Sequence, residues 1–254
     1  MDVKAYAKKL DQAAAEAHPI EQLSLKEHFD LEVAYDLQRE AILERMLRGN
    51  EIIGLKMGFT SVAKMEQMGV HDLIWGRLTS DMLISNGGSV NLASFIHPRA
   101  EPEICFRIAK DIHGEIALED LDEYVDAIAP AIEIIDSRFE NFKFSLEDVI
   151  ADNCSSAGVV IGEWHKPSRS IDGLQMKQYF NDEVVAEGSS EAILGDPWKS
   201  LQAATRLAAK YKEPIKTGHI VLAGAATAAI FLKPSTDVRV EVESLGEVSF
   251  TVKA

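Results

Sequence analysis

The sequence contains little cysteine, no long apolar run and comparatively few basic residues. Its two cysteines, Cys105 and Cys154, are too few for a disulfide framework and lack the spacing of a thiolate metal site. No apolar stretch approaches the length of a membrane span, and the first residues have the pattern of a charged amphipathic helix, which differs from a secretory signal. We therefore expect a protein of the reducing cytoplasm.

Basic residues are outnumbered, since 26 Lys and Arg stand against 41 Asp and Glu, and the formal net charge is -15. Nucleic acids and anionic membranes bind basic surfaces, so this charge argues against both as partners. An anionic substrate would need a local cation to hold it. With 46% hydrophobic and 26% charged residues among 254, the chain can bury a sizeable core.

The spacing of apolar residues changes along the chain. Helical periodicity covers residues 2–17 and 28–48, whereas short apolar runs separated by turn signals predominate from Glu51 onward. The expected strands are about 52–58, 94–111, 125–136, 157–164, 174–180, 183–188, 219–223, 227–232 and 237–252. Helices are expected at 118–124 and 197–211, and a helical turn at 62–68. The pattern predicts an α+β protein with a helical cap (1–50) and a mixed, mainly antiparallel β domain (51–254).

Three carboxylates lie on two of these expected strands. Glu101 and Glu103 point to one face, since residues i and i+2 of a strand do so, and Glu133 lies within an apolar run. A buried carboxylate is costly unless it is paired, hydrogen-bonded or bound to a cation. Oxygen ligands without thiols suit Mg²⁺ or Mn²⁺. The alternative is that Glu101 and Glu103 are solvated and Glu133 pairs with an arginine.

Lys56 lies in a short glycine-flanked strand. Partial burial would lower the pKa of its ammonium and let it pair with, or protonate, a substrate anion. Alternatively, it reaches solvent from the strand end. A small-residue turn at 222–229 could hold a carboxylate on its backbone N–H groups, or could serve packing alone.

The polar cluster after residue 134 also has two possible interpretations. Such a density of polar residues is typical of a loop network beside a site, yet Asp136 and Arg138 could equally form a structural ion pair. Ser155 and Ser156 lack the context of a serine nucleophile.

Six motifs, taken together and in this order, resemble the 2-hydroxypentadienoate hydratase and 4-oxalocrotonate decarboxylase family, which has the fumarylacetoacetate-hydrolase-like fold. They are GLKMGFTS (54–61), WGRLT (75–79), HPRAEPEI (97–104), EIIDSR (133–138), ADNCSS (151–156) and GAAT (224–227). The resemblance covers nearly the whole chain. It implies a mixed, mainly antiparallel β-roll or barrel-like domain after two helices.

The resemblance also implies the roles of individual residues. Glu101, Glu103 and Glu133 would bind Mg²⁺ or Mn²⁺, and Lys56 and Asp81 would be catalytic. A small dicarboxylate 2-oxo acid would be the substrate. Its binding residues would be Thr227, Ser156, Leu73 and Trp75, the last two with Phe59 as candidates for an apolar wall.

The segments 75–79 and 140–144 are more similar to the decarboxylase branch, which implies metal-dependent loss of CO₂ from 2-oxohex-3-enedioate. The apolar series Phe139, Phe142 and Phe144 fits this choice, because an apolar wall would destabilise the leaving carboxylate. At most some of the three can line the pocket, since alternation sends neighbouring residues to opposite faces, and the rest would be core. A homo-oligomer, and a complex with the pathway's hydratase, are further expectations.

Three alternatives follow. The first is the hydratase reaction, and the second a C–C bond hydrolase, for which His71 and His97 are the histidines near the motifs. The third, a non-catalytic binding protein, is disfavoured by the presence of the glutamates and Lys56.

Overall fold

The computed structural model of the chain describes residues 1–60, 65 and 72–254. Most of the expected helical turn at 62–68, and His71, lie outside the described residues. None of the described helices has the length and apolar character needed to cross a membrane.

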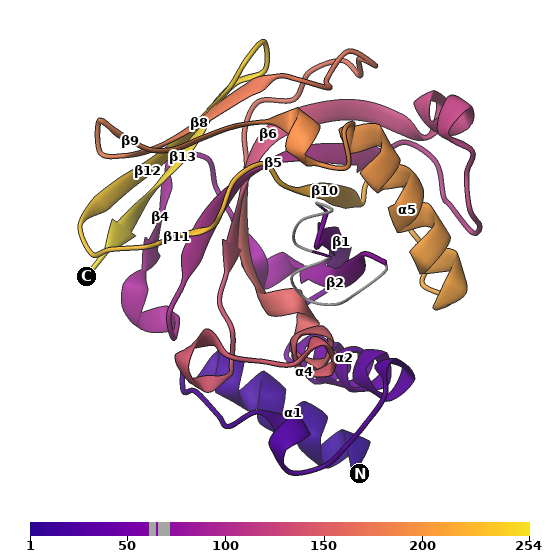
Figure 1. Cartoon of the computed structure of the whole chain (residues 1–254), viewed down its shortest axis with the longest axis vertical. Coiled ribbons are helices and arrows are strands. Elements are labelled where there is room, and N and C mark those ends of the chain that lie inside the picture. Colours follow the sequence, from indigo (N-terminus) through magenta and orange to yellow (C-terminus); the bar gives the residue numbers. More distant parts are fainter. Residues whose placement is uncertain (61–64, 66–71) are drawn as a thin grey trace.

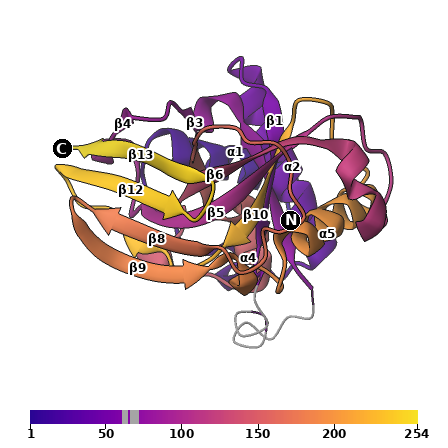
Figure 2. The same ribbon diagram turned by 90° about the horizontal axis from the view of Figure 1, so that it is seen from above.

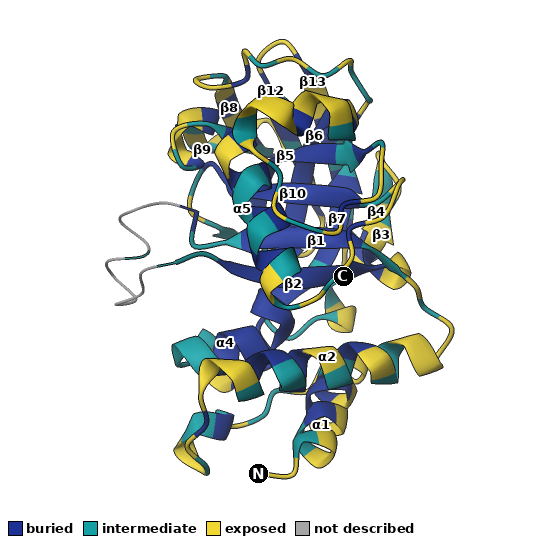
Figure 3. Cartoon of the chain, turned by 90° about the vertical axis from the view of Figure 1, so that its right-hand side faces the viewer, coloured by how far each residue is buried: buried dark blue, intermediate teal, exposed yellow. Residues whose placement is uncertain are grey.

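A helical layer opens the chain, as the sequence predicts. Helices α1 (Val3–Ala15) and α2 (Leu31–Leu47) begin where Asp2 and Asp30 accept hydrogen bonds from backbone N–H groups of the first turn. A short helix that the sequence did not predict, α4 (Leu146–Ala151), packs against α2. These three helices lie together below the strands in Figure 1, and Figure 3 shows them as a separate layer.

An eight-stranded sheet forms the centre of the molecule. Its order is β2-β1-β10-β5-β6-β7-β3, with β11 paired to β5. The strands are β1 (Ile52–Gly58), β2 (Ile74–Thr79), β3 (Leu83–Ile84), β5 (Arg99–Ile108), β6 (Val125–Ile135), β7 (Ser156–Ile161), β10 (Ile220–Ala225) and β11 (Ile230–Phe231). Most of β6 is buried on both faces, which explains its nearly continuous apolar sequence.

A five-stranded sheet covers part of the first one. Its order is β4-β13-β12-β8-β9, made of β4 (Gly88–Asn91), β8 (Gln175–Phe180), β9 (Glu183–Ser189), β12 (Thr236–Val242) and β13 (Gly246–Lys253). Buried residues alternate with more exposed ones along β12 and β13, so one face of this sheet packs inward. Figure 2 shows these strands side by side, away from α5 (Pro197–Lys210).

The larger sheet curls into a half-barrel, so the expected α+β fold with a mixed, barrel-like β domain after two helices is confirmed. Asn153 closes the curl: its side-chain amide accepts from Arg77 N (2.7 Å) and donates to Arg77 O (2.8 Å). The amide thus pairs with the edge strand β2 as a neighbouring strand would. One face of the sheet becomes an interior, where a small apolar cluster around Leu78, Cys105 and Leu222 fills one end.

Several expected elements differ in extent. The single strand expected over 237–252 is the hairpin β12–β13, turned at residues 243–245. The helix expected at 118–124 is a 3₁₀ segment, and the strand expected at 227–232 is reduced to β11. Mixed pairing is confirmed, since β1–β10, β3–β7 and β4–β13 are parallel. A domain boundary near residue 50 stays a prediction.

Candidate metal centre

Glu101, Glu103 and Glu133 meet inside the curled sheet. One carboxylate oxygen from each lies within 4.8 Å of the others. Glu101 and Glu133 are directly opposite each other in the antiparallel β5–β6 pair, and Glu103 follows two residues along β5 on the same face. Glu103 and Glu133 are fully buried and Glu101 is 7% exposed, so the alternative of a solvated strand face is wrong.

Three groups from other parts of the chain hold these carboxylates. Gly224 N donates to Glu103 Oε2 (2.7 Å), and the Ser156 hydroxyl donates to Glu133 Oε1 (2.9 Å). The Lys56 ammonium lies 2.8 Å from Glu133 Oε2. Glu133 therefore pairs with a lysine and not with an arginine. Ser156, expected to bind substrate, orients a carboxylate of the cluster.

Lys56 is buried, so the alternative that it reaches solvent is wrong. Its ammonium also donates to Cys154 O (3.2 Å). Burial by itself would lower the pKa of Lys56, but Glu133 and then Glu101 outweigh it, and the net shift is upward. The expected lowering of this pKa is therefore wrong for the metal-free protein, in which Lys56 is a firmly charged ammonium.

The cluster carries more negative charge than Lys56 neutralises. Burial, together with Glu133 and Glu101, raises the pKa of Glu103 well above its usual range, and burial also raises the pKa of Glu133. Glu103 Oε1 has no hydrogen-bond partner among the described residues. A divalent cation with a preference for oxygen fits this arrangement, because it would compensate the charge and coordinate the unpartnered oxygen.

An unusual backbone segment brings the supporting groups to the cluster. Asn153, Cys154 and Ser155 all have left-handed φ angles, of 50°, 51° and 58°. Such angles are uncommon outside glycine, and three in succession are costly unless the surroundings fix them. The segment directs the Asn153 amide to β2 and the Cys154 carbonyl to Lys56. Burial raises the pKa of the Cys154 thiol to about 12, so this thiol stays protonated near neutral pH.

Arg138 holds the segment that contains Asn153, Cys154 and Ser155 in place. Its guanidinium forms an ion pair with Asp152 and donates to the backbone oxygens of Asp136 (2.6 Å) and Ser156 (3.1 Å). The Asp136 carboxylate instead accepts from the backbone N–H groups of Ile96 and His97. Arg138 is structural, as one reading of the sequence held, but its acidic partner is Asp152.

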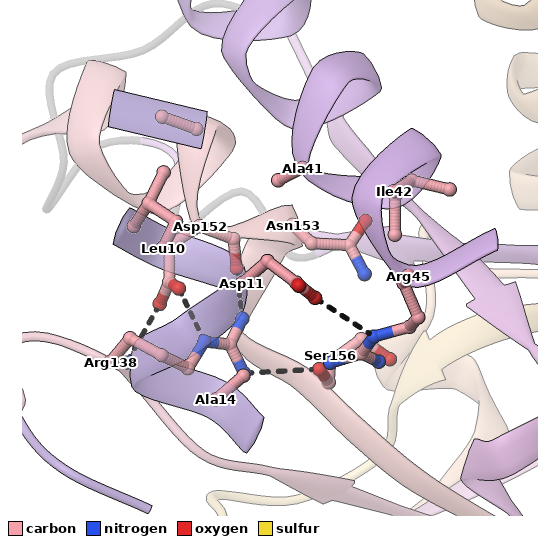
Figure 4. A pocket seen from close by; sticks show the side chains of 11 residues that line it. Leu10, Asp11, Ala14, Ala41, Ile42, Arg45, Arg138, Asp152, Asn153 and Ser156 are labelled. Atoms are coloured by element: carbon pink, nitrogen blue, oxygen red, sulfur yellow. Dashed lines mark hydrogen bonds and ion pairs between the residues drawn. The ribbon is translucent and has the colours of Figure 1, made fainter. Parts of the chain in front are cut away.

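The anchor lies against the helical layer. Arg138, Asp152 and Ser156 line a small cavity together with Asp11 of α1 and Arg45 of α2, and Figure 4 shows these side chains converging on it. Asp11 and Arg45 of the helical layer therefore face the same cavity as Ser156, whose hydroxyl donates to Glu133.

Trp75 and Leu73 lie away from the glutamates, contrary to the expectation of an apolar wall. Trp75 pairs with Met57 and so lies on the face of the sheet opposite to Lys56. Its ring stacks on Tyr35 of α2, with centroids 5.5 Å apart. Leu73 lines a cavity of about 340 Å³ with Tyr35 and Tyr211.

Asp81 is also separate from the glutamates. After β2 the chain turns into a 3₁₀ segment, where the Asp81 carboxylate accepts from the Thr79 hydroxyl (2.6 Å) and lies 3.8 Å from Arg45 Nε. The structure thus connects Asp81 to α2, and no described contact links it to the cluster.

Thr227 is expected to bind a substrate carboxylate, and the residue before it is hydrogen-bonded to β5. It follows Ala226, whose N–H donates to Pro102 O between Glu101 and Glu103. Its role in binding a substrate carboxylate stays a prediction. In the apolar phenylalanine series, Phe139 belongs to the core, whereas Phe142 and Phe144 are partly exposed and pack on each other.

The comparisons with known proteins agree with this geometry. The family model of the fumarylacetoacetate (FAA) hydrolase C-terminal region matches residues 61–253. The chain is 49% identical to a 4-oxalocrotonate decarboxylase of Pseudomonas sp, covering 99% of this chain and 98% of that protein. A hydratase of Pseudomonas putida that acts on the TodF product is 32% identical, over 87% of this chain and 83% of that one. A solved 4-oxalocrotonate decarboxylase from Pseudomonas putida G7, complexed with magnesium and adipate, superposes with a TM-score of 0.94 at 35% identity, over 98% and 97% of the chains.

Proposed function

The chain belongs to the fumarylacetoacetate hydrolase family, and on that premise we propose that it is a Mg²⁺- or Mn²⁺-dependent decarboxylase of 2-oxohex-3-enedioate (4-oxalocrotonate). The observation that carries this proposal is the buried cluster of Glu101, Glu103, Glu133 and Lys56, in a chain that matches a decarboxylase over nearly its full length. The product would be 2-hydroxypenta-2,4-dienoate, in the meta-cleavage degradation of aromatic compounds.

The three glutamates would hold the ion. When bound, the ion would supply Lewis acidity toward the 2-oxo acid end of the substrate. The site is suited to it because the donors are carboxylate oxygens, one of them unpartnered, in a buried setting.

Lys56 would stabilise the charge that develops during the reaction. The bond to the distal carboxylate breaks, CO₂ leaves, and the electron pair is delocalised through the conjugated chain to the 2-oxygen, which then takes up a proton. The Lys56 ammonium, fixed between Glu133 and Cys154 O, is a preorganised cation beside this negative charge and a donor for that proton. Because the interior is closed by Leu78, Cys105 and Leu222 at one end, little water reaches the ammonium from that side.

A direct assay tests the reaction. The purified chain with Mg²⁺ is given 2-oxohex-3-enedioate, and CO₂ release and loss of the dienedioate absorbance are followed. In a second assay it is given 2-hydroxypentadienoate. Efficient formation of 4-hydroxy-2-oxopentanoate in the second assay, without CO₂ in the first, would identify a hydratase and overturn the proposal.

Association and location belong to the same proposal. We expect the chain to work in the cytoplasm, as a homo-oligomer or together with the hydratase that consumes its product. Light scattering on the purified chain, alone and mixed with such a hydratase, measures both forms of association.

A further inference from the structure

Arg99 differs from every other arginine of the chain. Nine of the ten arginines have an acidic partner within 4.0 Å. Arg99 has none among the described residues, although the chain carries 41 acidic side chains. Its Nε is buried and makes no hydrogen bond there, while the side chain as a whole is only partly buried.

Arg99 is nevertheless held firmly in place. Its guanidinium carbon lies 4.1 Å from the ring centroid of Phe142 and 4.1 Å from that of Phe231. Phe231 of β11 is directly opposite Arg99 in the strand pair. Phe142 has a φ of 57° and follows Asn141 at 60°, so the backbone adopts two successive left-handed residues to place this ring on the guanidinium. Stacking between two rings fixes a cation while leaving its edge free to bind an anion.

The position of Arg99 connects it to the glutamates. Arg99, Glu101, Glu103 and Cys105 alternate along β5 and share one face of the curled sheet. Beyond Glu103, Cys105 belongs to the apolar cluster that fills the interior. On the other side of Glu101 stands Arg99, at the partly exposed end. A substrate that reaches the glutamates from this end must pass Arg99.

We infer that Arg99 binds the second carboxylate of a diacid whose 2-oxo acid end lies at the glutamates. The inference rests on the proposed function, since it assigns one end of that substrate. Same-face residues of a strand repeat every 6.5–7 Å or so, a separation that a six-carbon diacid can bridge. Arg99 is therefore a specificity residue, and it selects diacids over monoacids of the same length.

The expected effect is on binding and not on the chemical step. A cation beside the leaving carboxylate stabilises the charged ground state, and this charge disappears as CO₂ forms, so the contact gives no advantage in the transition state. Arg99→Gln should raise KM for the diacid about 10- to 100-fold, the range for loss of a charged hydrogen bond, while kcat should not fall, because the contact is no stronger in the transition state than in the ground state.

Calorimetry with two unreactive acids provides the decisive experiment. The full chain with saturating Mg²⁺ is titrated with adipate and with hexanoate, which differ only in the second carboxylate. The wild type should prefer adipate, and Arg99→Gln should lose about 10- to 100-fold in adipate affinity with hexanoate unchanged. Arg99→Lys, which keeps the charge without the planar fork, should retain part of the preference.

Arg107→Gln is the matched control, because Arg107 lies on the same face of β5, contacts an aromatic ring (Trp164, 5.0 Å) and pairs with Asp126. This variant should bind adipate as the wild type does. Normal adipate binding by Arg99→Gln would overturn the inference while leaving the proposed function intact. A fall in Mg²⁺ affinity of Arg99→Gln, titrated separately, would also overturn it, since Arg99 would then support the glutamates. If the wild type fails to bind adipate, the proposed function fails as well.

Discussion

Lys56 Nζ lies 2.8 Å from Glu133 Oε2, although their strands, β1 and β6, are separated in the sheet by β10 and β5. In a flat sheet, strands three places apart would be about 14 Å from each other, given a spacing of about 4.8 Å. The ion pair is therefore formed across the interior, and it requires the curl that Asn153 closes. The candidate site and the closure of the half-barrel depend on the same segment, residues 153–156.

Glu103→Gln tests the metal assignment. The substitution keeps the shape of the side chain and replaces a carboxyl group whose ionised form is disfavoured by burial and by Glu133 and Glu101, so the metal-free variant should be at least as stable as the wild type. The Mg²⁺-dependent rise in Tm and the decarboxylase activity should both be lost. Thermal unfolding with EDTA or with Mg²⁺, together with calorimetric titration of the ion, measures this. Retention of wild-type Mg²⁺ affinity would remove Glu103 from the ligand set.

Lys56→Met tests the role of the buried ammonium. We expect kcat to fall by about 10²-fold or more, the range for loss of a general acid or an electrostatic stabiliser. Removing one partner of a buried pair also leaves Glu133 uncompensated, which should cost the metal-free protein about 3–5 kcal/mol. Steady-state kinetics and urea unfolding give the two values.

Lys110→Met serves as the control, because Lys110 pairs with Glu123 at an exposed position. It should change neither kcat nor stability by a comparable amount. Turnover of Lys56→Met within a few-fold of the wild type would exclude Lys56 from the mechanism.

The raised pKa of Glu103 predicts how the stability of the metal-free protein changes with pH. Because burial and the neighbouring carboxylates raise this pKa in the folded state, the native protein holds a proton that the unfolded chain releases near pH 4.5. Stability of the metal-free protein should therefore decrease as pH rises from about 4.5 through the raised value.

Saturating Mg²⁺ should reverse this trend, because the ion binds the ionised carboxylates and a ligand at 100 times its Kd adds about 2.7 kcal/mol. Urea unfolding at several pH values, with EDTA or with Mg²⁺, gives both curves. A Mg²⁺-dependent stabilisation that does not grow with pH would contradict the charge state inferred for the cluster.

The sequence predicts those parts of the fold and site that depend on local pattern. Helices α1 and α2, the strands that carry the glutamates, and the common face of Glu101 and Glu103 follow from periodicity. Long-range relations are different. Nothing local shows that Glu133 pairs with a lysine from β1, or that three left-handed residues follow Asp152, although the polar run at 151–156 was a signal of a network there.

Trp75 shows the limit of motif-based reasoning most clearly. It belongs to a motif beside the lysine strand, yet strand register places it on the outer face, against Tyr35. A shift of one residue along a strand moves a side chain to the opposite face of the sheet. The face on which a side chain lies is therefore known only once its pairing partner in the neighbouring strand is known.

Gly224→Ala tests whether the close approach around Glu103 is required. Gly224 has a φ of 115°, and a Cβ there would lie 2.2 Å from Thr60 Oγ1, so alanine would be strained and would displace the N–H that donates to Glu103. We expect lower stability and weaker Mg²⁺ binding. Gly114→Ala is the control, since no atom lies within 4 Å of its Cβ position and its φ is ordinary, and it should be nearly neutral.

Adding Thr60→Gly to Gly224→Ala removes the collision but not the strained φ. If the double variant recovers part of the Mg²⁺ affinity, the recovered part was lost through the collision with Thr60. If Gly224→Ala alone binds Mg²⁺ as tightly as the wild type, the N–H of residue 224 does not position Glu103.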